Sequence, residues 1–154
     1  MQRPGFELPL LLAAAFRELI DSLHAELNKH GHGDARPSHG FALQAIGADG
    51  ATVSELGRRL GVTKQAAAKT AAGLEQVGYI TRRPSTHDAR ATVLTRTPRG
   101  EEMLALSVTI FEQLRRDWVR RLGAEQVRAV EDGLAAVVTG SGGAKIGDLP
   151  GWLR

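Results

Sequence analysis

The chain has 154 residues, 42% of them hydrophobic, which predicts one folded domain with a packed core. It contains no cysteine, so disulfides, thiolate metal sites and thiol-based redox sensing are excluded. The longest apolar run, Leu8–Phe16, is interrupted by Pro9 and is too short to cross a bilayer. Its amphipathic continuation argues against a signal peptide. We therefore expect a cytoplasmic protein with no membrane partner.

Two helices are predicted in the first third of the chain. Pro9 suits the first turn of a helix that continues to about Lys29, and a glycine-containing break follows at residues 31–34. A second helix is expected from about Ser38 to Ala48, where Asp49-Gly50 forms a turn. An apolar stripe at helical spacing follows the first helix, formed by Leu12, Phe16, Leu19, Ile20, Leu23 and Leu27. In the second helix the residues expected to face inward are Phe41, Leu43 and Ile46.

Two short helices joined by a glycine are predicted next. The first runs from about Ser54 to Leu60, with Thr52 or Ser54 as its cap, and Gly61 ends it because glycine accepts a left-handed backbone. Thr63 is a good N-cap for a second helix over about residues 64–77. The inward stripe of this second helix is Ala67, Ala71, Leu74 and Val77, so that Gln65, Lys69 and Ala72 point into solvent or toward a partner.

A β-hairpin is predicted after these helices. β-Branched residues dominate Tyr79–Arg83 and Ala91–Arg96, as is typical of strands, and the intervening Pro84–Arg90 is rich in turn-forming residues. Helix, tight turn, helix and a hairpin with a basic tip make up the winged helix-turn-helix arrangement. In such a module the second helix has the diameter to enter a DNA major groove.

Charge is distributed unevenly along the chain. Residues 52–100 carry nine lysines and arginines against three acidic residues, a net charge of +6, whereas the remaining residues carry a net charge of −3. The overall charge of +3 therefore hides a basic module attached to an acidic remainder. A phosphate backbone attracts such a module in a salt-sensitive manner, which makes double-stranded DNA the expected partner.

Two more helices are predicted after the hairpin. Thr97 is placed to cap and Pro98 to start a helix that reaches about Leu122, and a last helix covers about Ala124–Thr139. The apolar stripes of these helices either pack against a second copy of the chain or close the core of a monomer. Residues 140–154 begin with a glycine-rich linker and are expected to form a flexible tail, unless Ile146, Leu149 and Trp152 dock on the body.

Four motifs in this order and spacing carry a family resemblance. They are L-E-x-x-G-Y-I at residues 74–80, the pair Arg82-Arg83, Asp88-x-Arg90, and L-T-x-T-x-x-G at residues 94–100, which leads into a long helix. The stretch resembles the DNA-binding core of the MarR family of bacterial transcriptional regulators. The helix layout extends the resemblance over roughly Leu8 to Val138.

The resemblance implies one MarR-like domain over residues 1–154, mainly α-helical with a small β-hairpin wing. Residues 38–100 would form the winged helix-turn-helix lobe that binds DNA. Residues 8–30 and 97–139 would form a helical dimerisation region. The implied function is that of a homodimeric repressor, which binds a near-palindromic operator and is released by a small ligand.

Several residues are candidates for DNA contact. The Thr63 hydroxyl and the first N–H groups of its helix can hold a phosphate, because a helix N-terminus attracts anions. Lys64, Gln65 and Lys69 lie where side chains reach base edges or phosphates, although each lysine alone is equally typical of a solvated surface. The resemblance implies that Arg90 enters the minor groove and that Asp88 braces the wing by pairing with a nearby arginine. The complete predicted DNA-binding set is Thr63, Lys64, Gln65, Lys69, Arg82, Arg83 and Arg90.

Other readings of the sequence stay open. A basic wing also fits docking of the winged helix to an acidic partner protein. A metal-responsive regulator would use His24, His30, His32 and His39, but their spacing matches no strong zinc pattern, and the composition of an exposed helix terminus explains the cluster better. We expect no cofactor and no enzyme, because no nucleophile, carboxylate pair or cofactor loop stands out. The residues that fit either an effector pocket or the core are Phe16, Leu23, His39, Phe41 and Trp118.

Overall fold

The computed structural model of the chain describes residues 2–88 and 90–140, and the predicted tail at residues 140–154 lies outside them except for Gly140. Within the described residues the chain forms six helices and one two-stranded antiparallel hairpin, which confirms the predicted fold class. None of these helices is long and apolar enough to cross a membrane. The elements are α1 Glu7–Lys29, α2 Pro37–Ile46, α3 Val53–Leu60, α4 Lys64–Gln76, β1 Ile80–Pro84, β2 Thr92–Arg96, α5 Pro98–Leu122 and α6 Ala124–Gly140.

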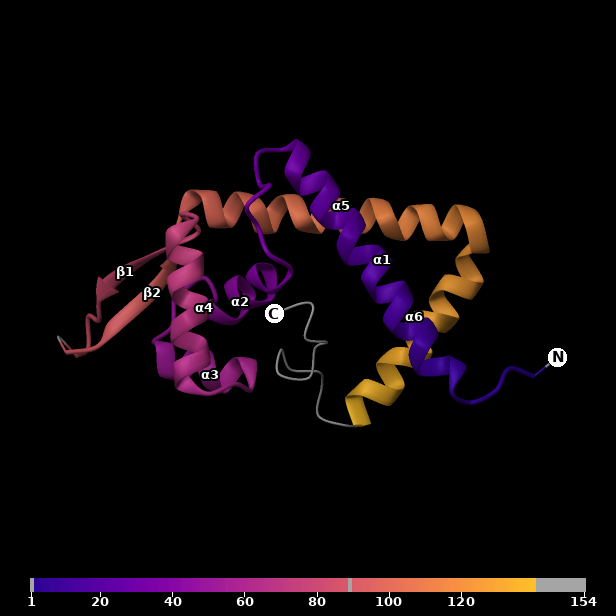
Figure 1. Cartoon of the computed structure of the whole chain (residues 1–154), viewed down its shortest axis with the longest axis horizontal. Helices are drawn as coiled ribbons and strands as arrows, with labels where there is room; N and C mark the ends of the chain where they lie inside the picture. The colour runs from indigo at the N-terminus through magenta and orange to yellow at the C-terminus, as the bar shows by residue number, and fades with distance from the viewer. Residues whose placement is uncertain (1, 89, 141–154) are drawn as a thin grey trace.

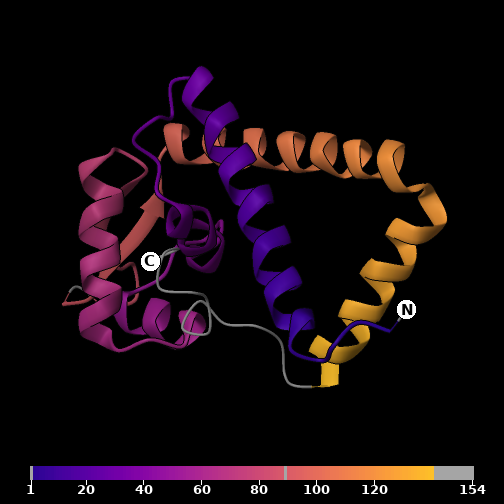
Figure 2. The same cartoon turned by 45° about the vertical axis from the view of Figure 1, so that its right-hand side comes forward.

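The described part of the chain has two regions (Figure 1). Helices α2, α3 and α4 and the hairpin gather into a compact unit, which we call the winged lobe (residues 37–96). Helices α1, α5 and α6 form the three sides of an open triangle (Figure 2), which we call the helical frame. Helix α5 belongs to both regions in space, because it begins against the winged lobe and ends at the far corner of the frame.

Local capping explains where α3 and α4 begin and end. Thr52 and Glu55 form a capping box, in which the Glu55 N–H donates to Thr52 Oγ1 at 3.2 Å and the Thr52 N–H donates to Glu55 Oε2 at 3.0 Å. Gly61 ends α3 with φ of 69°, a left-handed conformation that glycine adopts without strain. Thr63 then caps α4 by accepting the Ala66 N–H at 3.1 Å. The predicted boundaries of both helices are therefore correct to within one residue.

The hairpin pairs Ile80 with Arg96 at its base and Pro84 with Thr92 near its tip. Pro84 lies within β1 rather than in the loop where the sequence had placed it. The strand tolerates this proline because β1 is an edge strand and Pro84 is its last residue. A bridge between Ala51 and Leu94 attaches the hairpin to the segment before α3.

The core lies mostly in the winged lobe and where α1 and α5 cover it. The predicted inward residues Leu43 and Ile46 of α2 are fully buried, but Phe41 is 37% exposed, so its predicted core position is wrong. Phe41 precedes Leu43 by two residues, and two residues correspond to about 200° around a helix. When Leu43 faces the core, Phe41 therefore turns toward the surface between α2 and the frame.

The start of α5 lies very close to the turn that follows α4. Gly100, in the first turn of α5, is so near the backbone that a Cβ atom there would collide with the Tyr79 carbonyl oxygen. The Thr97 N–H donates to the same carbonyl oxygen at 3.0 Å, and the Thr97 hydroxyl donates to the Gly78 carbonyl oxygen at 2.5 Å. These contacts leave no room for a side chain at position 100.

We expect Gly100→Ala to lower the free energy of unfolding by about 1–3 kcal/mol, because the backbones must separate to admit the methyl group. The matched control is Gly40→Ala in α2, where an added Cβ has no neighbour within 4 Å. That change should be neutral or stabilise by up to about 1 kcal/mol, through helix propensity. Chemical denaturation measures the free energy of unfolding of both variants. Equal midpoints for the two would contradict the close approach of Gly100 to the Tyr79 carbonyl oxygen.

Candidate nucleic-acid interface

The exposed side of α4 carries the residues that the sequence singled out. Thr63, Lys64, Gln65 and Lys69 are all exposed, whereas Ala67, Ala71 and Leu74 on the opposite side are fully buried. Arg83 and Arg90 are exposed on the hairpin that lies beside α4 (Figure 1). The predicted DNA-binding residues thus occupy two adjacent exposed elements of the winged lobe.

Four of the nine basic residues in the segment 52–100 form hydrogen bonds or ion pairs with other parts of the chain. Arg59 Nη1 donates to the Ala45 and Ile46 carbonyl oxygens at 2.8 and 3.3 Å, and Arg96 Nε donates to the Leu43 carbonyl oxygen at 2.8 Å. Arg59 satisfies carbonyl groups that α2 leaves open at its C-terminus, and Arg96 adds a second donor to the Leu43 carbonyl oxygen, which also accepts the Gly47 N–H. Their charge therefore stabilises the lobe and is less available to a partner.

The remaining engaged pair ties neighbouring elements together. Arg82 Nε donates to Glu75 Oε1 at 3.2 Å and so links β1 to α4. Arg99, in the first turn of α5, donates to the Val77 and Gly31 carbonyl oxygens and to the Asp34 carboxylate. Arg82, which the sequence placed among the DNA contacts, thus has an intramolecular partner. Its contact with DNA stays a prediction.

Five cations of the segment remain exposed, and their side chains have no hydrogen-bond or ion-pair partner among residues 2–88 and 90–140. Four of them were singled out from the sequence. The fifth, Arg58, was missed, although its position two residues after the buried Leu56 already turns it away from the core of α3. These five free cations are Arg58, Lys64, Lys69, Arg83 and Arg90.

Hydrogen bonds to the backbone shape the tip of the wing. Ser85 Oγ accepts the N–H groups of His87 and Asp88 at 3.2 and 3.3 Å, and Asp88 Oδ1 accepts the Arg90 N–H at 2.9 Å. The partner of Asp88 is thus a backbone group, whereas the sequence had suggested an arginine side chain. Asp88 thus holds the backbone of Arg90, and Arg90 is exposed to solvent.

The histidines do not form the exposed group that the sequence suggested. His32 and His39 are buried, with 1% and 4% of their surface exposed. His32 Nδ1 shares a hydrogen bond of 2.9 Å with the Tyr79 hydroxyl, and His39 Nδ1 accepts the Arg36 N–H at 3.0 Å. The assignment to an exposed helix terminus is therefore wrong for these two residues. The described residues contain no group of three side chains placed to hold a metal ion.

The residues predicted for an effector pocket do not all meet in one place. A cavity of about 100 Å³ lies between α1, α2 and α5, with Leu23 and Phe41 among its lining residues beside His24, Met103 and Phe111. His39 lies instead on the other side of α2, against α4. Phe16 and Trp118, partly buried on α1 and α5, lie outside the lining of this cavity. Their contact with a ligand stays a prediction.

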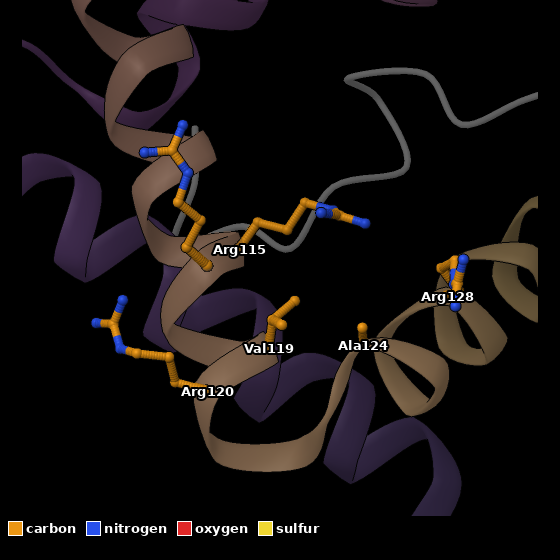
Figure 3. A pocket seen from close by; sticks show the side chains of 6 residues that line it. Arg115, Val119, Arg120, Ala124 and Arg128 are labelled. Atoms are coloured by element: carbon orange, nitrogen blue, oxygen red, sulfur yellow. The ribbon is translucent and has the colours of Figure 1, made fainter.

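Figure 3 shows a second basic surface, a cavity of about 550 Å³ at the corner between α5 and α6. Arg115 pairs with Glu131 through two hydrogen bonds of 2.6 and 3.0 Å, and Arg120 pairs with Asp117. Hydrogen bonding to the Glu131 carboxylate raises the pKa of Arg115, and hydrogen bonding from Arg115 lowers the pKa of the Glu131 carboxyl. Because acidic partners neutralise these arginines, the corner is a weaker candidate for anion binding than α4 and the wing.

The tight α3–α4 turn, the exposed basic face of α4 and the hairpin define the winged helix-turn-helix class of proteins. Residues 36–91 match the family model described as the MarR family. This match, with the fold, confirms the resemblance to the MarR family that the sequence motifs indicated. No curated protein matches the chain.

Solved structures of similar fold cover most of the chain. Streptococcus pneumoniae FabT in complex with DNA is 20% identical with a TM-score of 0.73, covering 87% of this chain and 94% of its own. A mutant of S. aureus MepR bound to an oligodeoxyribonucleotide is 19% identical with a TM-score of 0.60, covering 86% and 96%. Wild-type MarR from E. coli in its apo form is 20% identical with a TM-score of 0.65, covering 90% and 99%. These likenesses show a shared fold.

The buried His39 makes the stability of the fold depend on pH. Burial, and next the nearby Arg36 charge, lower its pKa from 6.5 to about 4. The unfolded chain binds a proton near pH 6.5 and the folded chain only near pH 4, so stability is full above pH 6.5 and is lost as the pH falls toward 4. As the pH falls from 7 to 5, protonation of His39 in the unfolded chain should lower the free energy of unfolding by about 2 kcal/mol.

The matched variant is His39→Gln, since glutamine is a usual capping-box partner at this position and keeps an acceptor for the Arg36 N–H. Denaturant titrations at several pH values should show a shallower loss of stability in the variant. Some slope will persist, because burial also lowers the pKa of His24. Identical pH profiles for the two proteins would rule out His39 as the source.

Proposed function

We propose that the protein is a sequence-specific DNA-binding transcriptional regulator that acts as a homodimeric repressor and has no enzymatic activity. The observation that carries the proposal is the separation of the basic residues into two groups. Arg59, Arg82, Arg96 and Arg99 are engaged in the fold, whereas the five free cations project from α3, α4 and the hairpin. A duplex supplies the matching anionic surface.

The geometry supports insertion of α4 into a major groove. The Thr63 hydroxyl and the first N–H groups of α4 lie at the exposed start of the helix, where they can bind a phosphate. Gln65 and Lys69 extend from the same side and can donate to base edges. Arg90, held at the wing tip by Asp88, suits an adjacent minor groove, where negative potential is concentrated. The solved complexes of FabT and MepR with DNA share this fold.

The frame supports a dimer. Exposed apolar side chains gather on the N-terminal part of α1 and along α6, and these segments lie together at one corner of the triangle (Figure 2). A second copy of the chain would bury this surface across a two-fold axis. Two α4 helices would then read half-sites about one helical turn apart in a near-palindromic operator. The exposed residues are Phe6, Leu8, Leu10, Leu11, Leu12, Val130, Leu134, Val137 and Val138.

A ligand between frame and lobe would release the repressor. The cavity lined by Leu23 and Phe41 lies where α1 and α5 meet α2. Its volume of about 100 Å³ is below the ~300–1,000 Å³ typical of ligand pockets. A larger effector must therefore push the lobe away from the frame. It shifts the equilibrium only if it binds the displaced arrangement more tightly.

Selection of bound sequences from random duplex tests the proposed function. The proposal expects enrichment of a near-palindromic sequence that the protein retains against excess random competitor. Binding to an acidic protein, without preference for any duplex at low ionic strength, would instead favour the protein-docking alternative.

On the selected operator, Lys69→Ala and Arg90→Ala should each weaken binding, by roughly 1–3 kcal/mol if the side chain reads a base. If Lys69 contacts a phosphate, the slope of log affinity against log salt should fall by about one. The matched control is Lys29→Ala, which removes a lysine of the frame that pairs with Glu26. Gel-shift titrations in which the control loses as much affinity as Lys69→Ala would remove Lys69 from the interface.

The dimer is tested by Leu134→Glu, which places a charge on an apolar residue that is 42% exposed in the single chain. Burying an unpaired carboxylate is costly, so we expect dissociation into monomers and loss of full-operator binding. Gln126→Glu adds a charge to the same helix at a polar position and should leave the dimer intact. Light scattering after size-exclusion chromatography measures the molar mass, and hence the oligomeric state, of both variants. A wild-type monomer at micromolar concentration would contradict the dimer outright.

A further inference from the structure

Arg99 connects three segments that are far apart in the sequence. Its Nε donates to the Val77 carbonyl oxygen at 3.1 Å, and both of its Nη atoms lie 3.3 Å from the Gly31 carbonyl oxygen. Nη2 also donates to Asp34 Oδ1 at 2.9 Å. One guanidinium group thus joins the start of α5, the end of α4 and the loop between α1 and α2. We call this contact region the junction (Gly31, His32, Asp34, Val77, Tyr79, Arg99 and Glu102).

Tyr79 forms the buried floor of the junction. Its ring is fully buried, with the Arg99 guanidinium carbon 5.1 Å from the ring centre and the His32 ring stacked at 5.7 Å. Burial is the main cause that raises the pKa of Tyr79 to about 12, so its hydroxyl keeps its proton. His32 Nδ1 bonds that hydroxyl, and His32 Nε2 lies 3.7 Å from the Glu102 carboxylate of α5. Side chains from the α1–α2 loop and from α5 therefore both contact Tyr79.

The junction lies at the C-terminal end of α4. The opposite, N-terminal end is the one predicted to contact DNA bases, and we call it the reading end. Val77 caps the C-terminus of α4, whereas Thr63 and Lys64 stand at its N-terminus. In Figure 1, α4 begins beside α3 and ends beside the start of α5. The helix has 13 residues and is therefore about 20 Å long. A rotation of about 10° at the junction would move the reading end by about 3 Å, which is close to the rise of one base pair.

We propose that Arg99 is a positioning residue that sets the angle between the winged lobe and the helical frame, and so determines which half-site spacing the dimer accepts. The inference rests on the proposed function, because spacing has meaning only for a dimer that reads two half-sites. Arg99 contacts no DNA in this account. It acts through the carbonyl oxygens of Val77 and Gly31 and the Asp34 carboxylate.

The planar fork of arginine is what the junction requires. Three acceptors from two segments surround the guanidinium, and its carbon also lies over the Tyr79 ring. Lysine has the charge but lacks the fork, so it cannot bond the three acceptors at once with this geometry. Arg99→Lys should therefore leave the dimer and the free cations unchanged, while the angle between the winged lobe and the helical frame becomes less fixed. Asp34→Asn weakens the same Arg99–Asp34 contact by removing the charge of its acceptor.

The experiment compares the wild-type dimer, Arg99→Lys and Asp34→Asn on operators with the selected spacing and with one base pair added or removed. Wild type should lose about tenfold in affinity when the spacing changes, as for a mismatched site. For both variants, the affinity for operators of altered spacing should lie within about threefold of the affinity for the selected operator. Their affinity for a duplex that carries a single half-site should equal that of the wild type. Arg59→Lys is the matched control, because Arg59 links α3 to α2 within the lobe.

The outcomes separate the two proposals. If wild type discriminates between spacings and both variants discriminate equally well, Arg99 does not set the angle and the inference is overturned. If Arg59→Lys loses discrimination to the same extent, the effect reflects general destabilisation and the inference is also overturned. If wild type prefers no duplex at all, the proposed function fails, and the inference fails with it.

Discussion

The close packing of the start of α5 on the turn after α4 is the contact on which the rest of the structure depends. Gly100 permits it because any side chain there would meet the Tyr79 carbonyl oxygen, and Thr97 secures it by bonding the Gly78 and Tyr79 carbonyl oxygens. The turn carries α4 on one side and β1 on the other. Its attachment to α5 therefore places both elements of the candidate interface relative to the frame.

Arginine has two different tasks in this chain. At the C-terminus of α2, Arg59 and Arg96 bond carbonyl oxygens of the helix, and Arg99 bonds the carbonyl groups of two segments at once. Elsewhere in the segment the five free cations extend from α3, α4 and the wing. The net charge of the segment counts both kinds of basic residue equally. The proposed interface therefore carries less charge than the total suggests, and it is concentrated on three neighbouring elements.

The frame and the lobe differ in how completely they bury apolar surface. The lobe encloses Leu43, Ile46, Leu56 and Leu74 fully, whereas α1 and α6 leave many apolar side chains in solvent. Such a surface is typical of a protein–protein contact. The small cavity lies between these two regions, and its α5 lining begins at Met103, directly after the junction residue Glu102. In these proposals dimerisation would use α1 and α6, effector binding would use α1, α2 and α5, and lobe orientation would be set at the start of α5, so that each involves a helix of the frame.

The sequence by itself determined the elements and their order. Thr52, Thr63 and Thr97 cap their helices, and Gly61 ends α3 as predicted, because capping involves residues within a few positions of one another. The family resemblance also followed from short motifs. Only the tertiary structure decided which cations are free, that His32 and His39 are buried, and that Phe41 faces outward. Arg99 and the Gly31 carbonyl oxygen are 68 positions apart, and no local pattern encodes a hydrogen bond across that distance. The partner of a long polar side chain is decided when the helices pack, because packing brings the acceptor within reach.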